Sequence, residues 1–451
     1  MSRDRSRRSG AVDPARLAAY DVLVAVREDD AYANLVLPRL LRERGIQGRD
    51  AAFATELVGG TLRGLGAYDA IIDHLTSREP DPAVRDALRL GLHQVLALRV
   101  ADHAAVSSTV ELVRLRQGER PVGFVNAVLR KAGAHDLDGW MVRLEAPLHV
   151  RHSHPRWVVE ALERALARPE ELVALLEADN LRPSVTLVAR PGLSTVEELG
   201  GGVDSGLSTV SPLGVVLPSG DPGAVPAVRE GRAGVQDAGS QLVALALTRA
   251  AVEGSGEGRD ERWVDVCAGP GGKAALLAAL ATQRGARLLA SERAPHRARL
   301  VAQALRATGG DVVAADGTRP PWLPGTFDRA LVDAPCSGLG ALRRRPESRW
   351  RRAPEDLEAL VPLQRSLLAA TLGSVRPGGV VVYATCSPVV EETAGVVEAV
   401  LAERSDVRLE DALPLLPEVD DARSAHLAGA VQLWPHRHGT DAMFVALLHR
   451  L

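Results

Sequence analysis

YATCSP, residues 383–388, directly follows the apolar run GVVV, residues 379–382. A short apolar run of this kind is typical of a buried strand in a parallel sheet. Ser387 is a good N-cap and Pro388 suits a first helical position, so we expect a helix to begin directly after Cys386. A thiol at that junction would face unpaired amide donors and a positive helix end, which favour the thiolate. On this stretch alone, the alternative is that Cys386 is a small buried hydrophobic residue.

Short apolar segments alternate with segments of helical periodicity from residue 262 onwards. The expected strands are 263–266, 287–290, 311–314, 327–332, 379–383 and 443–447, and the expected helices are 272–282, 294–306, 355–374 and 391–402. This alternation predicts a Rossmann-like, doubly wound parallel sheet. The ligand of such a sheet lies outside the carboxyl ends of its strands, so the residues that follow each strand are candidates for function.

The first part of the chain is helical throughout. Apolar residues recur with a spacing of three and four in the segments 15–26, 33–41, 51–62, 67–75, 82–100, 103–115 and 122–134. Gly and Pro separate several of these segments, so we predict an all-α bundle of about seven helices over residues 13–135. FVNAVLR, residues 124–130, resembles the last helix of NusB-like RNA-binding bundles. The alternative is a bundle with a purely structural role.

Two further regions flank the bundle. Residues 1–12 are basic and polar and are expected to form a disordered tail. Segments 157–166 and 170–178 are expected as linker helices, 184–189 as a strand and 195–199 as a short helix. These features predict linker helices and a small α/β subdomain within residues 136–233, followed by the sheet domain over residues 234–451.

Composition and charge exclude several classes of protein. A chain of 451 residues suggests two or three domains, and a formal net charge of -3 gives no strong field that would select a partner. No run of about 18 apolar residues occurs, and the start lacks the apolar core of a secretory signal, so we expect a cytoplasmic protein that spans no membrane. The three cysteines show no CxxC spacing and the histidines lack a neighbouring ligand cluster, so neither a disulfide framework nor a metal site is expected.

Unusual residues follow the first three strands of the predicted sheet. CAGPGGK, residues 267–273, has glycines that let the backbone approach a ligand at a helix start, but it matches neither GxGxxG nor the phosphate loop GxxxxGK[ST]. Glu292 follows the second strand and can accept hydrogen bonds from both hydroxyls of a ribose, and Asp316 follows the third strand, where an adenine edge would lie. Together they predict an S-adenosyl-L-methionine site. The predicted cofactor-binding residues are Cys267, Ala268, Gly269, Pro270, Gly271, Gly272, Lys273, Glu292, Asp316 and Asp333.

The three cysteines of the chain, Cys267, Cys336 and Cys386, all follow strands of this one sheet. CAGPGGK, DAPCS (residues 333–337) and ATCS (residues 384–387) resemble the signature motifs of the RsmB/Sun (NOL1/NOP2/Sun) family of RNA cytosine-5 methyltransferases. The resemblance covers most of residues 13–451, and the NusB-like front is similar to that of the members that methylate 16S rRNA. This sequence has Gly269 where the family usually has alanine, and the longer Glu292 where aspartate is commoner.

The resemblance implies a role for each motif. Cys386 would be the nucleophile that adds to carbon 6 of cytosine, and Cys336 would assist product release. Asp333 would contact the cytosine or its protonated ring nitrogen, beside the methionine end of the cofactor. Lys273, one of only two lysines, is expected to brace the glycine loop or nearby carboxylates. The implied partner is RNA, most directly 16S rRNA, bound by a monomer to which the subdomain within 136–233 contributes RNA contacts.

RRRPESRWRR, residues 343–352, carries six arginines and one acid shortly after the Asp333 loop. Its position predicts an RNA phosphate clamp, with Trp350 stacking or packing. The predicted RNA-binding residues are Arg343, Arg344, Arg345 and Arg349. The alternative is a solvated run of charges.

Three other functions stay open. A DNA cytosine-5 methyltransferase would use Cys336 as its nucleophile, and the second cysteine, Cys386, argues against it. A non-catalytic RNA-binding ribosome assembly factor would have no need for the intact cysteine pair. A cytosine-5 methyltransferase that acts on tRNA or another RNA has the same motifs, so the sequence does not separate it from the 16S rRNA enzyme.

Overall fold

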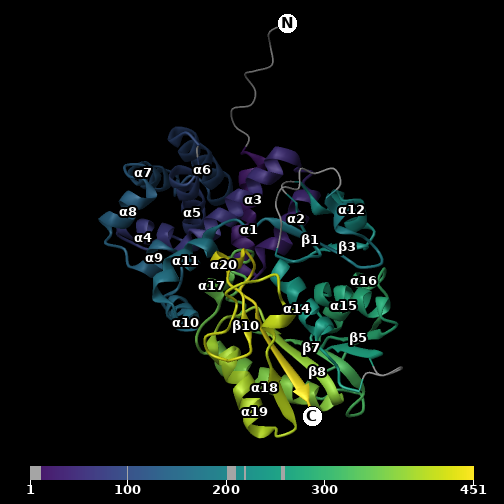
Figure 1. Ribbon diagram of the computed structural model, residues 1–451. Coiled ribbons are helices and arrows are strands. Elements are labelled where there is room, and N and C mark those ends of the chain that lie inside the picture. Colours follow the sequence, from purple (N-terminus) through teal and green to yellow (C-terminus); the bar gives the residue numbers. More distant parts are fainter. Residues whose placement is uncertain (1–11, 99, 201–209, 218–219, 255–259) are drawn as a thin grey trace. The chain divides into compact units, whose positions relative to one another are not determined.

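The computed structural model describes residues 12–98, 100–200, 210–217, 220–254 and 260–451 (Figure 1). The chain forms two compact units. The helical unit consists of residues 1–159, 180–182 and 342–351, and the sheet unit consists of residues 160–179, 183–341 and 352–451. The predicted tail lies outside the described residues except for Val12. Among the described helices, none is both long and apolar enough to cross a membrane.

The helical unit begins with the seven helices that the periodicity predicts. They are α1 (Pro14–Glu28), α2 (Ala33–Glu43), α3 (Gly48–Arg63), α4 (Leu65–Leu75), α5 (Pro82–Leu96), α6 (Asp102–Gln117) and α7 (Val122–Ala132). Asp13 and Asp81 cap α1 and α5, each directly before a proline at the first helical position. The apolar stripes of the helices meet in one core, in which Leu57, Ile71 and Leu88 are completely buried. The prediction of a helical bundle is confirmed.

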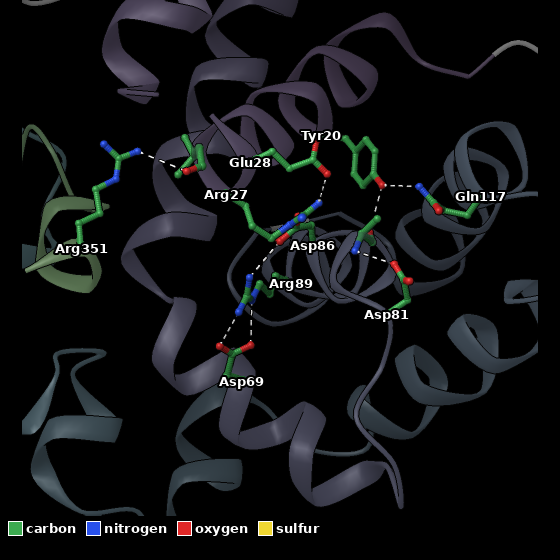
Figure 2. A network of polar contacts seen from close by, with 11 residues as sticks. Tyr20, Arg27, Glu28, Asp69, Asp81, Asp86, Arg89, Gln117 and Arg351 are labelled. Carbon is green, nitrogen blue, oxygen red and sulfur yellow. Dashed lines mark hydrogen bonds and ion pairs between the residues drawn. The ribbon is translucent and has the colours of Figure 1, made fainter. Parts of the chain in front are cut away.

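Ion pairs cross the interior of this bundle (Figure 2). The carboxylate of Asp86 on α5 is almost fully buried and lies 2.7 Å from Nε of Arg27 on α1 and 2.9 Å from Nη1 of Arg89. Burial raises the pKa of Asp86, although the hydrogen bond from Arg27 opposes that shift. Arg89 also binds both carboxylate oxygens of Asp69 on α4. The network therefore links α1, α4 and α5, and removal of one charged group would leave a buried charge without its partner.

Three short helices complete the helical unit: α8 (Leu137–Arg143), α9 (Leu148–Arg151) and α17 (Ser348–Arg351). The last of these lies on the segment Leu342–Arg351, which the sequence assigned to the sheet domain. Arg349 is completely buried, and its Nη1 donates to the carbonyl oxygen of Ser153 at 3.0 Å and to Oδ1 of Asn180 at 2.7 Å. These contacts explain why this segment of the predicted domain 234–451 belongs to the helical unit.

The same segment supplies a cap to α2. No side chain of the neighbouring sequence caps the first turn of this helix, because its N-cap position is Tyr32. Glu347 fills this role with a buried carboxylate that accepts from the backbone N–H of Ala33 at 3.0 Å. Arg351 pairs with Asp30 at 3.1 Å and lies over the ring of Tyr32. Figure 2 shows Arg351 extended from α17 towards the end of α1.

The sheet unit contains a mixed sheet with strand order β10-β11-β8-β7-β4-β5-β6. Strand β9 also pairs with β11, along residues 447–450. Its strands are β4 (Arg262–Asp265), β5 (Arg287–Ser291), β6 (Asp311–Val313), β7 (Phe327–Asp333), β8 (Val375–Thr385), β9 (Val407–Glu410), β10 (Val431–Gln432) and β11 (Phe444–Arg450). The strands from β4 to β8 are parallel, and β11 runs antiparallel to β8. The Rossmann-like sheet is confirmed. The sequence missed β9 and β10, which are short and carry charged or polar residues.

Helices cover both faces of this sheet (Figure 1). One face packs on α14 (Ala238–Arg249), α15 (Gly272–Gln283) and α16 (Pro295–Ala304), and the other on α18 (Asp356–Ser374) and α19 (Ala394–Glu403). Residues of β8 alternate between the two cores, with Val380 and Val382 on the first face and Val381 and Tyr383 on the second. The order of strands reverses between β4 and β7, which is the point where ligands bind in open α/β sheets.

A second sheet of the sheet unit is antiparallel and has the order β2-β1-β3. Its elements are β1 (Val185–Ala189), β2 (Gly214–Leu217), β3 (Ala233–Val235), α12 (Val196–Gly200) and α13 (Pro226–Arg229). Their apolar side chains form a small core of their own. This is the predicted small α/β subdomain, although β2 and β3 were not predicted and residues 201–209 lie outside the described part. The remaining elements are α10 (Arg156–Leu166), η1 (Pro169–Glu171), α11 (Leu172–Asn180), η2 (Pro222–Ala224), η3 (Val390–Glu392), η4 (Leu413–Leu415) and α20 (Pro435–His438).

Candidate active site

The carboxyl ends of four neighbouring parallel strands hold most of the predicted site residues. The glycine loop begins two residues after β4, Glu292 directly follows β5, Asp333 is the last residue of β7 and Cys386 directly follows β8. Strands β7 and β8 are paired in register, with Asp333 opposite Ala384. The loops that follow these two strands therefore leave the sheet side by side, which brings together cysteines 50 residues apart in the sequence.

Cys336 and Cys386 form a hydrogen-bonded pair. Their Sγ atoms lie 3.5 Å apart, and both residues are partly exposed. The hydrogen bond with Cys336 lowers the pKa of Cys386, and the same bond raises the pKa of Cys336. Either sulfur could donate in this pair, and the lowered pKa of Cys386 favours its sulfur as the one that becomes the thiolate. Of the two sulfurs, Cys386 is the better nucleophile.

The reason for this low pKa differs from the one that the sequence suggested. No α-helix begins at Pro388: residues 387–389 form a loop, η3 follows, and α19 begins only at Ala394. The Ser387 hydroxyl accepts from the backbone N–H of Val389 at 3.2 Å and donates to the Glu392 carboxylate at 2.6 Å. The chain turns tightly here instead of starting a helix. The prediction that a helix dipole activates Cys386 is wrong, and the neighbouring thiol takes that role.

An ion pair lies beside the two thiols. Nζ of Lys273 is 2.9 Å from Oδ2 of Asp333. Burial alone would lower the pKa of Lys273, but the charge of Asp333 and the hydrogen bond to it raise that pKa, so the ammonium persists. Its positive charge also lowers the pKa of Cys386, whereas Asp333 raises it. Lys273 thus braces a carboxylate, as expected, and its charge also acts on the Cys386 thiol.

The glycine loop contacts the acid that follows β5. The backbone N–H of Gly269 donates to Oε2 of Glu292 at 3.1 Å, and the other carboxylate oxygen accepts from the backbone N–H of Ala294 at 3.0 Å. A Cβ atom on Gly269 would lie only 2.2 Å from Oε2 of Glu292. The two departures from the family pattern are therefore linked, because the longer acid occupies the space that an alanine would need.

A second acid lies at the end of β4, two residues before this loop. Asp265, the last residue of β4, is completely buried, and its pKa is raised to about 8 by burial and by the charge of Asp333. Apart from the backbone N–H of Cys267, its carboxyl has no hydrogen-bond donor among the described residues. A buried acceptor of this kind suits the amino group of an S-adenosylmethionine methionine moiety. The residues present thus fit that cofactor.

The other predicted cofactor residues lie at the same edge of the sheet. Asp316 accepts from the backbone N–H and the hydroxyl of Thr318, and these bonds lower its pKa. Its second carboxylate oxygen faces Arg293 at 3.9 Å and is partly exposed. Burial raises the pKa of Cys267, so this residue stays a thiol. The cofactor roles of the loop, Glu292 and Asp316 stay predictions.

The arginine run has a different environment from the one predicted. Arg349 is completely buried and Arg343 nearly so, and the ring of Trp350 packs against Gly66 of α4. A guanidinium that already binds Ser153 and Asn180 inside the helical unit cannot also bind a phosphate. The prediction of RNA contact is therefore wrong for Arg349, and burial argues against it for Arg343. Arg344 is half-buried and Arg345 is exposed over the Tyr32 ring, so for these two it stays a prediction.

The sequence missed a set of buried polar residues behind the two cysteines. Glu392 and Gln364 are completely buried: Glu392 accepts hydrogen bonds from Ser337 and Ser387, and Gln364 donates to Glu392 and to the carbonyl oxygen of Pro335. Their partners come from three separate segments, so no local pattern could reveal them. Glu392 instead resembled an ordinary acid in the first turn of a helix.

Known proteins resemble this chain over its whole length. The family model described as 16S rRNA methyltransferase RsmB/F matches residues 257–449, and the NusB family model matches residues 13–133. A protein of Mycobacterium tuberculosis named as a methyltransferase is 51% identical, and the alignment covers 100% of this chain and 99% of that protein. Ribosomal RNA small subunit methyltransferase B of Pseudomonas syringae is 34% identical over 87% of this chain and 88% of its own. The chain belongs to the RsmB/F methyltransferase family.

Solved structures share the fold of this chain. The crystal structure of PH0851 superposes with a TM-score of 0.80 at 21% identity and covers 98% of this chain and 99% of that chain. The structure of NSun6 from Pyrococcus horikoshii gives a TM-score of 0.54 at 19% identity over 66% of this chain and 98% of its own. At these identities the likeness concerns the fold. Membership of the RsmB/F family makes the chain an rRNA methyltransferase in class, as its motifs implied.

Proposed function

We propose that the chain transfers a methyl group from S-adenosyl-L-methionine to carbon 5 of one cytosine in 16S rRNA, through a covalent bond between Cys386 and the base. The observation that carries this proposal is the thiol pair in the loops that follow β7 and β8, in which the Sγ atoms of Cys336 and Cys386 lie 3.5 Å apart. A methyltransferase that only needed to approach an exposed nitrogen or oxygen would have no use for an activated thiolate.

Cytosine chemistry explains why two thiols are needed. Carbon 5 is a poor nucleophile, and addition of the Cys386 thiolate to carbon 6 creates an enamine that makes it reactive. When bound, the cofactor supplies an electrophilic methyl group on a sulfonium. After transfer, the proton on carbon 5 must leave so that the electron pair of that C–H bond can expel the Cys386 thiolate from carbon 6. Cys336 can accept this proton only after its own thiol proton has passed to water, and its raised pKa makes the resulting thiolate the stronger base of the two sulfurs.

The neighbouring charges support the same reaction. Addition to carbon 6 places negative charge on the base, and protonation of its ring nitrogen relieves that charge. Asp333 follows β7 next to the thiols and is held by Lys273 at 2.9 Å, so it can bind the protonated ring nitrogen. The cofactor would lie over the glycine loop, with its ribose towards Glu292 and its adenine towards Asp316.

The RNA substrate is supported by relatives and by the helical unit. Relatives across most of this chain are named ribosomal RNA small subunit methyltransferase B, and the front of the chain matches the NusB family. We assign the RNA contacts to the helical unit and the small subdomain, with Arg344 and Arg345 as candidates for phosphate contact. We also assign the protein to the cytoplasm, where it would act as a monomer.

Single cysteine variants test the chemistry. Cys386→Ala should abolish methylation and form no covalent RNA adduct. Cys336→Ala should form the bond and transfer the methyl group, but fail to lose the carbon 5 proton, so that RNA stays attached to Cys386. A denaturing gel separates free from RNA-bound protein, and peptide mapping locates the bond. An adduct on Cys336, or one formed by Cys386→Ala, would favour the DNA-type mechanism instead.

Substrate choice needs its own measurement. Bisulfite sequencing of 16S rRNA, 23S rRNA and tRNA after incubation with the protein should show one new 5-methylcytosine, in 16S rRNA alone. Methylation confined to tRNA would contradict the assignment of the substrate while leaving the cysteine chemistry intact.

A further inference from the structure

A single buried carboxylate binds both loops that carry the catalytic cysteines. Glu392 lies at the end of η3 and is completely buried. Its Oε1 accepts from the backbone N–H of Ser337 at 2.8 Å and from Nε2 of Gln364 at 3.0 Å. Its Oε2 accepts from the hydroxyls of Ser337 at 2.5 Å and Ser387 at 2.6 Å. Four donors thus converge on one side chain.

The sequence positions of these donors explain their importance. Ser337 directly follows Cys336, and Ser387 directly follows Cys386. The two serine hydroxyls also lie 3.0 Å from each other, and Gln364 donates in addition to the carbonyl oxygen of Pro335, the residue before Cys336. Each cysteine is therefore flanked by a residue that this cluster holds in place.

We propose that Glu392 is a positioning residue that holds the loops of Cys336 and Cys386 in register and so sets the distance between their sulfurs. This inference rests on the proposed cysteine mechanism. A thiol is a weak donor, and its hydrogen bond is lost after a small displacement of either loop. Bonds to an ionised carboxylate are about twice as strong as neutral ones, so four of them can hold two loops in register.

The charge of Glu392 adds an electrostatic effect to the geometric one. Its negative charge is among the causes that raise the pKa of Cys336. Lys273, in contrast, stabilises the thiolate of Cys386. The two charges favour the same arrangement, with the proton on Cys336 and the negative charge on Cys386. Asp333 and Asp441 also face Cys386 and raise its pKa, so the hydrogen bond from Cys336 has to outweigh them.

Glu392→Gln tests this role, because it keeps the shape of the side chain and removes its charge. In the variant, the NH2 group of the glutamine would face groups that donate hydrogen bonds to the carboxylate in the wild type, so some of these hydrogen bonds are lost. We expect the apparent pKa of Cys386, measured from the pH dependence of its alkylation by iodoacetamide, to rise by about one unit, so that alkylation at pH 7 slows by about tenfold. Methylation should slow by at least the same factor, with the KM for RNA changed less than about twofold.

Glu391→Gln is the matched control. Glu391 precedes Glu392 but lies at the surface, where it pairs with Arg164 at 3.1 Å. This variant should keep the wild-type alkylation profile and rate. Should Glu392→Gln not fold, Ser337→Ala and Ser387→Ala each remove one hydroxyl donor and should each shift the profile part of the way.

The alkylation readout needs no RNA, so it separates this inference from the proposed function. If wild-type protein forms no adduct with RNA through Cys386, the proposed function fails, whatever the alkylation profile shows. If folded Glu392→Gln or the folded serine variants alkylate Cys386 with the wild-type pH profile, Glu392 is only a structural residue and the inference is overturned. Loss of stability without a change in that profile has the same meaning.

Discussion

At the scale of single residues, the identities of Gly269 and Glu292 depend on each other. Gly269 and Glu292 each depart from the pattern of the family that the sequence resembles, and the structure places Oε2 of Glu292 in the space that a Cβ atom on Gly269 would need. Neither departure is a defect, because the larger acid requires the smaller loop residue.

This pair predicts a compensating double variant. Gly269→Ala should weaken binding of S-adenosylhomocysteine by about tenfold, because the new methyl group displaces Glu292. Adding Glu292→Asp should restore much of that affinity, with a coupling free energy of about 1–2 kcal/mol. Isothermal titration calorimetry measures both. Gly373→Ala, on α18 and outside the glycine loop, is the control, since its Cβ would meet nothing within 4 Å. Additive effects of the two substitutions would contradict the link.

Asp265 predicts a pH dependence of stability. Burial raises its pKa to about 8, so between roughly pH 4 and pH 8 the folded chain holds a proton that the unfolded chain releases. Its contribution to stability is therefore complete at low pH and is lost as the pH rises through 8. Asp265→Asn should remove this loss, so that the melting temperature of the cofactor-free protein falls less between pH 5 and pH 8 than in wild type.

Asp316→Asn is the control for that measurement. The hydroxyl of Thr318 lowers the pKa of Asp316, so this group stays ionised throughout the pH window and should leave the wild-type slope unchanged. An Asp265→Asn protein whose melting temperature falls as steeply as that of wild type would show that Asp265 titrates normally.

At the scale of elements, the loop between β7 and α17 is tied to two other segments through Gly340. Its backbone N–H donates to the carbonyl oxygen of Cys386 at 2.9 Å, and its own carbonyl oxygen accepts from Ala442 at 2.8 Å. A Cβ atom here would lie 2.2 Å from the Ala442 carbonyl oxygen and 2.9 Å from that of Cys386. The loop can follow this path only without a side chain.

Opposite effects are therefore expected from two glycine substitutions. Gly340→Ala should lower the unfolding free energy by about 2–3 kcal/mol and reduce methylation, because the Cys336 loop must move. Gly373→Ala, on α18, meets nothing within 4 Å and should stabilise the protein by about 0.5–1 kcal/mol through helix propensity. Thermal unfolding measures both, and a neutral Gly340→Ala would refute the close approach.

The same scale shows what sequence patterns can predict. Helices α1 to α7 and the parallel strands were predictable because each has its own hydrophobic period. The thiol pair was partly predictable, since both cysteines follow strands of one sheet. The start of a helix after Cys386 was not, because Ser387 binds Glu392 instead of capping a helix. The role of Arg349 was misjudged, and the cap that Glu347 supplies was not predicted, because the partners of both residues lie more than 150 residues away in sequence.

At the scale of the whole molecule, the arginine run divides into structural and surface residues. Arg349→Ala should destabilise the helical unit by about 3–5 kcal/mol, because it leaves Ser153 and Asn180 without their buried partner. Arg345→Ala should leave the melting temperature unchanged, weaken RNA binding and reduce its salt dependence by about one counterion. Calorimetry and RNA titrations at several salt concentrations separate the two. Equal losses of stability would contradict the division.

The discontinuous helical unit also sets an order of events during synthesis. Helices α1 to α7 leave the ribosome first, but Arg349 and Glu347 are made more than 180 residues after Val159. At about 5–20 residues per second, the buried site for Arg349 stays open for roughly ten to forty seconds. During that interval the helical unit lacks the contacts of Arg349 with Ser153 and Asn180 and the cap that Glu347 gives to α2. The helical unit is therefore complete only after β7 and the loop that carries Cys336 have been made.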